Sequence, residues 1–119
     1  MKRDMELIRQ ILLEIEKHPF TEIPFEVNIE GQSPETVSYH LMLLGEAGLI
    51  EAHNMNIQQR FWWQAKRLTW QGHEFLDAAR DDTLWDRVKK KLAETSGTAS
   101  IQVITAMLIE MAKRKLMLP

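Results

Sequence analysis

The chain has 119 residues, 45% of them hydrophobic and 27% charged, which predicts a folded domain with one core and excludes a disordered segment. It has no cysteine, so disulfides and thiolate metal sites are excluded. It has no run of about 18 apolar residues, and its start, MKRDMELIRQ, is too polar for a secretory signal, so we expect a cytoplasmic protein without membrane association.

Charge is distributed unevenly along the chain. Residues 1–59 contain four Lys or Arg against ten Asp or Glu, whereas residues 60–119 contain eleven against seven. The formal net charge of −2 argues against a protein that coats nucleic acid. If a polyanion binds, the positive field should come from the second half; the alternative is that these charges are solvated on helix faces. The cations there include Arg60, Lys66, Arg67, Arg80, Arg87 and Lys89 to Lys91.

The first predicted helix follows Asp4, whose side chain can cap free backbone N–H groups, and it ends near His18 and Pro19. Apolar residues recur in it at helical spacing, which predicts one buried face. These residues are Met5, Ile8, Ile11, Leu12 and Ile15.

The next segment, PFTEIPFEVNIEGQ, does not have a helical pattern. It contains two prolines, and Phe25, Val27 and Ile29 alternate with polar residues, so it predicts a short strand or a loop. This departs from an ordinary helix-turn-helix, which has a short helix at this point.

A second helix is predicted within SPETVSYHLMLLGEAGLIEA, residues 33–52. Ser33 can cap its first turn, and Pro34 suits the first helical position because its missing N–H would have no helical partner there. Gly48 can adopt the left-handed conformation that ends a helix, and a strand then begins at Leu49. The predicted buried residues are Val37, Leu41 and Leu44.

A β-hairpin is predicted between about residues 49 and 68, because a polar loop, EAHNMNIQQR, precedes the aromatic stretch FWWQAKRLTW. Trp62 and Trp63 are adjacent, so in a strand they point to opposite faces, and at least one should be partly exposed. They are interpreted either as one core and one strand-edge tryptophan or as contacts for a partner.

Two further helices are predicted before residue 95. Thr69 caps the first, which runs to Arg80, and Thr83 with Asp86 resembles a capping box for the second. The predicted inward side chains are Trp70, His73, Phe75, Leu76 and Ala79 in the first helix, and Trp85, Val88 and Leu92 in the second.

The last predicted helix, at about residues 100–116, follows the linker-like stretch ETSGTAS and is apolar on nearly all sides. Such a helix needs cover on more than one face, so we expect residues 1–95 to form one domain and residues 96–119 to form a self-association element. The alternative is that its methionines are ordinary core residues. The predicted dimer contacts are Ile104, Met107, Leu108 and Met111.

The stretch TVSYHLMLLGEAGLIE resembles the recognition helix and first wing strand of bacterial winged-helix regulators, in which an LT-x-x-G pattern, here LTWQG, commonly follows the wing. With MKRDMELIRQILLEIE and LTWQGHEFLDAARDD, it also resembles a family of small bacterial and phage proteins classed only as a domain of unknown function, over residues 1 to about 100. The resemblance implies an α+β, mainly α, winged helix-turn-helix-like domain with a β-hairpin wing and extra C-terminal helices. It implies a cytoplasmic, often phage-linked setting and no catalytic residues.

The sequence contains no pattern that indicates catalysis or metal binding. The four histidines form no pair at metal-ligand spacing, and there is no phosphate-binding glycine loop and no nucleophile elbow. Neighbouring carboxylates such as Glu14 and Glu16 point apart on a helix. We therefore expect no enzyme activity, no metal and no cofactor.

Two functions remain as hypotheses. The first is a DNA-binding transcriptional regulator of bacterial or phage origin; the second is a protein-interaction module, for instance a phage inhibitor or accessory factor, that does not bind DNA. Residues 33–47 contain no cation, so phosphate contacts would come from the hairpin. The predicted DNA contacts are Thr36, Ser38, Tyr39, His40, Arg60, Lys66 and Arg67, and the predicted partner contacts outside the last helix are Tyr39, Met42, Trp62 and Trp63. The expected partners are double-stranded DNA, a second copy of the chain or another protein.

Overall fold

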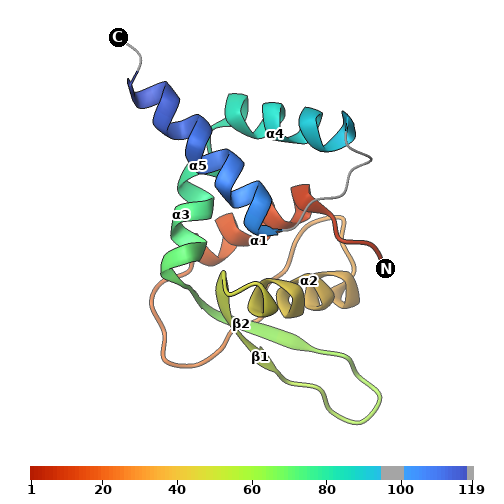
Figure 1. Ribbon diagram of the computed structural model, residues 1–119. Coiled ribbons are helices and arrows are strands. Elements are labelled where there is room, and N and C mark those ends of the chain that lie inside the picture. The colour runs from red at the N-terminus through yellow and green to blue at the C-terminus, as the bar shows by residue number, and fades with distance from the viewer. Residues whose placement is uncertain (95–100, 118–119) are drawn as a thin grey trace. The chain divides into compact units, whose positions relative to one another are not determined.

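The computed structural model describes residues 1–94 and 101–117 (Figure 1). These residues form an α+β structure that is mainly helical, which confirms the predicted class, with five helices and one antiparallel hairpin. In chain order the elements are α1 (Met5–Lys17), α2 (Pro34–Glu46), β1 (Ile50–Asn54), β2 (Trp63–Leu68), α3 (Trp70–Ala79), α4 (Asp82–Glu94) and α5 (Ile101–Met117).

Contacts divide the chain into two units, Met1–His73 and Glu74–Pro119, with the boundary inside α3. The sequence analysis placed its boundary at residue 95 instead. Because α4 packs against α5, both helices belong to the second unit. The linker-like stretch at residues 95–100 lies outside the described residues.

Helix α1 begins at the predicted cap. The Asp4 carboxylate accepts hydrogen bonds from the backbone N–H groups of Glu6, at 3.0 Å, and Leu7, at 3.2 Å. Met5, predicted to be in the core, is only half-buried. Leu7 is buried instead of Met5, because the buried face of α1 is rotated slightly from the predicted one. The buried residues of α1 are Leu7, Ile8, Ile11, Leu12 and Ile15.

The segment between α1 and α2 contains no helix, as predicted. Phe25 pairs with Ala65 of β2 through two backbone hydrogen bonds, of 2.8 and 3.0 Å, so it adds a single bridge to the free edge of β2. The His18 ring stacks on the Phe25 ring with a centroid distance of 3.6 Å. Val27, two residues further on, is buried. These contacts fix the segment against the first unit without a helix.

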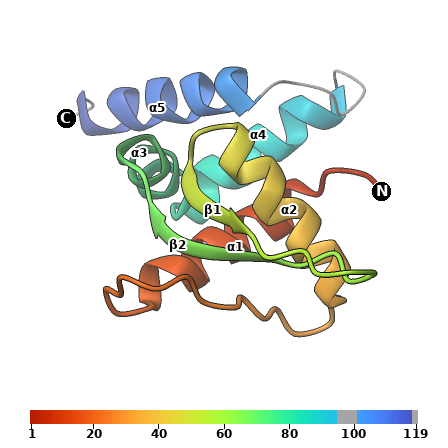
Figure 2. The ribbon, with the colours of Figure 1, turned by 90° about the horizontal axis from the view of Figure 1, so that it is seen from below.

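Helix α2 and the hairpin follow the predicted pattern closely. The Ser33 hydroxyl accepts from the backbone N–H of Thr36 at 3.2 Å, and Gly48 has a φ of 77° after the helix. The strands β1 and β2 pair antiparallel, and α2 packs against both of them. In both views the hairpin loop lies at an outer edge of this unit (Figures 1 and 2). The buried face of α2 includes Val37, Leu41 and Leu44.

Helix α3 is rotated relative to the prediction. Its cap is correct, since the Thr69 hydroxyl accepts from the backbone N–H of Gly72 at 3.1 Å. However, Trp70 is 76% exposed and His73 is also exposed, so their predicted inward positions are wrong. The reason is that Gly72 lies against the Leu49 backbone, where a β-carbon would be 1.9 Å from the carbonyl oxygen. The buried positions of α3 are Gly72, Phe75, Leu76, Ala78 and Ala79.

In the second unit, the start of α4 also differs from the prediction. The carboxylate that caps it belongs to Asp81, which accepts from the backbone N–H groups of Thr83, at 2.9 Å, and Leu84, at 3.1 Å. Thr83 therefore lies inside the helix instead of capping it. Trp85 is buried and meets the Phe75 ring edge to face at a centroid distance of 6.2 Å. The other buried residues of α4 are Leu84, Val88 and Leu92.

Candidate interaction surface

The exposed face of α2 carries no positive charge. With about 100° of rotation per residue, Glu35, Tyr39, Met42 and Glu46 fall on one side of the helix, opposite the buried stripe. Glu35 and Glu46 are exposed, while Tyr39 and Met42 are half-buried. The face therefore presents a carboxylate near each end and an aromatic and a thioether side chain between them.

Two of the four predicted base-reading residues are not on this face. Ser38 is 4% exposed, and its hydroxyl accepts a hydrogen bond from the backbone N–H of Trp63 at 3.1 Å. His40 is 0% exposed; its Nε2 accepts from the backbone N–H of Asp4 at 2.9 Å, which leaves Nδ1 to donate to the Thr36 carbonyl at 2.8 Å. Both side chains join parts of the first unit, so their assignment as DNA contacts is wrong.

The other two residues of α2 that were predicted to contact DNA bases are partly exposed. Thr36 is half-buried, and its hydroxyl lies 2.8 Å from the Ser33 hydroxyl at the helix cap. Tyr39 is half-buried beside His40, with the two rings edge to face at 5.8 Å. Of the four residues of α2 predicted to contact DNA bases, Tyr39 is thus the largest that is still partly exposed.

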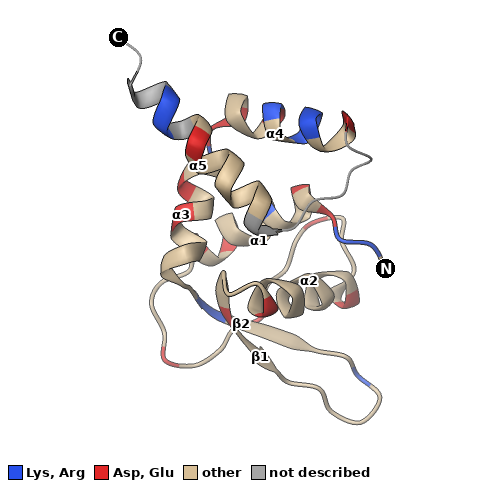
Figure 3. Cartoon of the chain, in the orientation of Figure 1, with Lys and Arg blue, Asp and Glu red and all other residues tan. Residues whose placement is uncertain are grey.

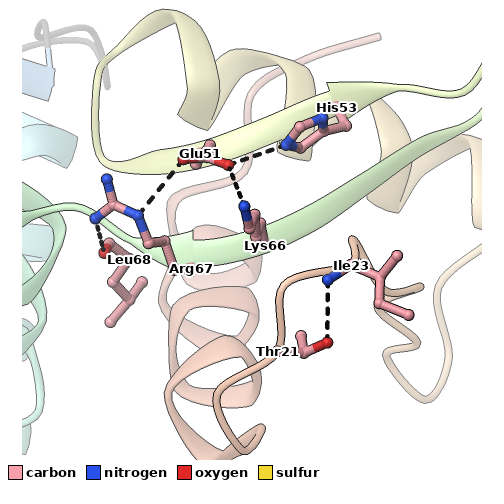
Figure 4. Close-up of polar contacts among 7 residues, drawn as sticks. All are labelled: Thr21, Ile23, Glu51, His53, Lys66, Arg67 and Leu68. Atoms are coloured by element: carbon pink, nitrogen blue, oxygen red, sulfur yellow. Dashed lines mark hydrogen bonds and ion pairs between the residues drawn. The ribbon is translucent and has the colours of Figure 1, made fainter.

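The hairpin places two of the predicted phosphate-binding cations around one carboxylate (Figure 4). Glu51 lies 3.6 Å from the Lys66 ammonium, 3.5 Å from the Arg67 guanidinium and 3.0 Å from Nε2 of His53. The pairing of β1 with β2 contains a bulge between Glu51 and Ala52, so Lys66 has no partner residue on β1. The side chains of Lys66 and Arg67 can therefore both reach the Glu51 carboxylate.

The surroundings of Glu51 favour its ionised form. The hydrogen bond with His53 lowers the pKa of the Glu51 carboxyl below its ordinary value of 4.5, and the positive charges of Lys66 and Arg67 act in the same direction, while partial burial opposes them. No pattern in the sequence singled out Glu51. Its place opposite Arg67 depends on the strand register, which the sequence pattern left open.

Arg60, the third predicted phosphate contact, lies near the hairpin tip. Its guanidinium is 3.8 Å from the Glu26 carboxylate and stacks over the Trp62 ring at 4.3 Å from the centroid. All three hairpin cations therefore already have a carboxylate partner. Exposed ion pairs of this kind are weak, so the carboxylates reduce the local positive field but another anion could replace them.

The outer part of the hairpin is nearly free of charge (Figure 3). Between Ala52 and Ala65 the only charged side chain is that of Arg60, and the stretch is rich in amides and aromatic rings. Ile57 is 59% exposed, and Phe61 is 37% exposed. Trp62 and Trp63 are both half-buried, which agrees with the prediction that at least one would be partly exposed. Their indole N–H groups have no acceptor among the described protein atoms.

The predicted dimer contacts on α5 divide into two pairs. Ile104 and Leu108 are 0% exposed, so they are core residues within the chain and their assignment as partner contacts is wrong. Met107 and Met111 are half-buried and line surface hollows beside α4 and α5. Val103, one position before Ile104, is 51% exposed. The apolar surface that α5 offers is therefore narrower than its composition predicts. The apolar side chains of Ile101 and Leu116 lie outside the described set.

Within the described ranges, no three His, Asp or Glu side chains are grouped so that they could hold a metal ion. In the same part of the chain, none of the helices combines the length and hydrophobicity needed to cross a bilayer.

A family model described as "Hypothetical protein (DUF2513)" matches residues 2–99. The chain belongs to this family. The match confirms the predicted resemblance to a family of unknown function and its predicted extent. A relative that carries the name "Uncharacterized protein", from Haemophilus influenzae (strain ATCC 51907 / DSM 11121 / KW20 / Rd), is 41% identical over 105 residues, which cover 87% of this chain and 89% of the relative. No solved structure matches significantly. Neither description names an activity.

Proposed function

We propose that this chain is a protein-interaction module with a winged-helix-like fold, and that its contact surface consists of the exposed face of α2 and the outer hairpin. The observation that carries the proposal is the exposed face of α2, where Glu35 and Glu46 flank Tyr39 and Met42 and no cation is present. A helix with this face would bring carboxylates against phosphates in a DNA groove, so it suits a protein surface better.

The order of the elements supports the winged-helix part of the proposal. Helix α1, the strand bridge at Phe25, helix α2 and the hairpin follow one another as the first helix, first strand, recognition helix and wing of that fold would. The helix that ordinarily precedes the recognition helix is replaced by the extended segment 19–33. Without that helix, α2 lacks the neighbour that usually crosses the DNA backbone.

The composition of the surface supports a protein partner. Tyr, Trp, Met and Arg are enriched in the centres of protein interfaces, and Tyr39, Met42, Trp62 and Arg60 are of these types. Such a module fits a cytoplasmic accessory or inhibitory factor of bacterial or phage origin.

DNA binding by a bacterial or phage regulator is the second candidate. The observation that favours it is that Arg60, Lys66 and Arg67 all lie on the hairpin, at the place of a wing, and Arg60 and Arg67 have side chains that are 54% exposed. If their carboxylate partners exchange for phosphates, the hairpin would bind a duplex weakly and with strong dependence on salt.

The test measures both activities on the same protein. Fluorescence anisotropy with random duplex DNA at about 50 and about 200 mM salt should show no binding, whereas an exposed phosphate-binding wing would bind at the lower concentration only. Immobilised full-length protein should retain a specific protein from host extract, and the Tyr39→Ala/Met42→Ala variant should lose it. Glu22→Ala, an exposed substitution outside the surface, is the matched control. Salt-sensitive DNA binding that Lys66→Ala/Arg67→Ala abolishes would replace the proposal with the second candidate.

A further inference from the structure

A cationic hollow lies along α4 and α5, within the second unit. Its volume is about 600 Å³, and half of the residues that line it are cations. Among the described residues that line this hollow, Glu94 is the one carboxylate, and Leu84 and Met111 contribute apolar surface. The cations are Arg87, Lys90, Lys91 and Arg114.

An apolar hollow of about 670 Å³ adjoins the first one, because both are lined by Lys91, Met111 and Arg114. Its further lining includes Val103, Ala106, Met107 and Glu110 of α5, and the Glu110 carboxylate lies 3.5 Å from the Arg114 guanidinium. The two hollows form one groove, which we call the α4–α5 groove, with positive charge toward Arg87 and apolar side chains toward Val103. A groove of this kind fits a helix that carries both carboxylates and apolar groups.

The first unit contains such a helix in α2. Its exposed face has Glu35 and Glu46 eleven positions apart, a rise of roughly 16 Å along the axis, with Tyr39 and Met42 between them. The two units also differ in charge. Residues 1–73 contain seven Lys or Arg and ten Asp or Glu, so they are acidic, whereas residues 74–119 contain eight Lys or Arg and seven Asp or Glu, so they are slightly basic. An acidic, apolar helix face and a basic, apolar groove are therefore present in one chain.

We infer that the α4–α5 groove of one copy of this protein binds the exposed face of α2 from a second copy. The inference rests on the α2 surface of the proposed function and names its partner. Glu35 and Glu46 pair with the groove cations, while Tyr39 and Met42 pack on the apolar lining. A dimer in which each copy gives its α2 face to the other copy's groove contains the same interface twice. A nucleic acid is a poorer occupant, since phosphates do not use the apolar lining at Leu84 and Met111, and no described residue of the lining is aromatic and able to stack on a base.

The inference is tested by reversing the charge on each side in the full-length protein. Variant one is Glu35→Lys/Glu46→Lys, and variant two is Arg87→Glu/Lys90→Glu. Sedimentation analysis should show a dimer for the wild type, and each variant alone should associate at least about tenfold more weakly, because like charges then face each other in both interfaces. Mixed together, the variants should form a heterodimer, since the basic α2 of one meets the acidic groove of the other and the remaining interface is native. The control, Glu22→Lys/Glu30→Lys, makes the same charge change away from α2 and should leave the dimer intact.

The mixing experiment also excludes misfolding, because an unfolded variant would not be rescued by its counterpart. A wild type that stays monomeric, or a mixture in which no heterodimer forms, overturns the inference. So does binding of duplex DNA or RNA that variant two abolishes while the wild type remains a monomer. If the protein is monomeric but still retains a foreign protein that Tyr39→Ala/Met42→Ala releases, only the partner assigned here is wrong and the proposed function stands.

Discussion

The hydroxyl oxygen of Ser38 accepts a hydrogen bond from the backbone N–H of Trp63, at 3.1 Å and across 25 positions of the sequence. Ser38 belongs to α2, and Trp63 is the first residue of β2, so the bond joins the helix to the strand that leaves the hairpin loop. It fixes the outer hairpin relative to α2, and a surface that contains both elements is therefore assembled before a partner arrives.

Replacing Ser38 with Ala should destabilise the protein. The Trp63 N–H would lose its acceptor in a largely buried position, which costs about 1 to 3 kcal/mol. Chemical denaturation followed by tryptophan fluorescence would measure this cost. Gln59→Ala, in the exposed loop, is the control and should change the free energy of unfolding by less than about 0.5 kcal/mol. Equal unfolding midpoints for wild type and Ser38→Ala would show that the bond contributes nothing.

Replacing Gly72 with Ala should be more damaging than its helical context suggests. In an exposed helix interior this change stabilises by up to about 1 kcal/mol, but here the new β-carbon would lie 1.9 Å from the Leu49 carbonyl oxygen, so the backbone must move. We expect a loss of about 2 to 3 kcal/mol. Gly45→Ala is a graded comparison, since its β-carbon would meet only the Ala52 side chain, at 3.0 Å, and it should cost less. The reverse order of the two thermal midpoints would contradict the packing described.

The hairpin tip should be stabilised by replacing Gln58 with Gly. Gln58 has a φ of 44°, and it lies in a two-residue turn that the Arg60 N–H closes by a 2.8 Å bond to the Ile57 carbonyl. This left-handed conformation costs a side-chain-bearing residue about 1 kcal/mol, and glycine avoids most of that cost. We expect a gain of roughly 0.5 kcal/mol in the free energy of unfolding for Gln58→Gly. Gln59→Gly, at a position without positive φ, should give no gain, and a gain there would argue against a specific effect at Gln58.

Acid should remove the contribution of Glu51 to stability. Its pKa in the folded protein is below the ordinary value of 4.5, so its stabilising effect is complete above that pH and is lost as the pH falls through the lowered pKa. The difference in unfolding midpoint between wild type and Glu51→Gln should therefore be constant near neutral pH and shrink below about pH 4.5.

A carboxyl-carbon NMR titration would identify the cause of that shift. His53→Ala should raise the Glu51 pKa, because the hydrogen bond with His53 is its largest cause, and Lys66→Ala should raise it less. A Glu51 pKa that does not respond to the loss of His53 would refute the assignment.

Features that depend on neighbours in the sequence were predicted well. The caps at Asp4, Ser33 and Thr69 and the left-handed Gly48 each involve groups within a few positions of one another. The extended segment before α2 was also predicted, because its prolines exclude a regular helix there.

Features that depend on contacts between distant parts of the sequence were not predicted. Ser38 and His40 have the small polar and imidazole groups of DNA-reading residues, yet they bond to Trp63 and Asp4, which are 25 and 36 positions away. Trp70 was assigned to the core from the apolar pattern of its helix, but the close approach of Gly72 to Leu49 turns it outward. In each case the deciding contact joins segments that no local pattern relates.

The amino-acid sequence by itself determined which stretches form helices, where α1, α2 and α3 start and the approximate boundaries of the hairpin, since these follow from backbone hydrogen bonding and apolar periodicity over a few residues. Only the tertiary structure decided which polar side chains remain exposed. That depends on where the strands and loops bring backbone N–H groups and carbonyls within bonding distance. The acidic, apolar face of α2 and the paired cations of the hairpin therefore became visible only once the chain was folded.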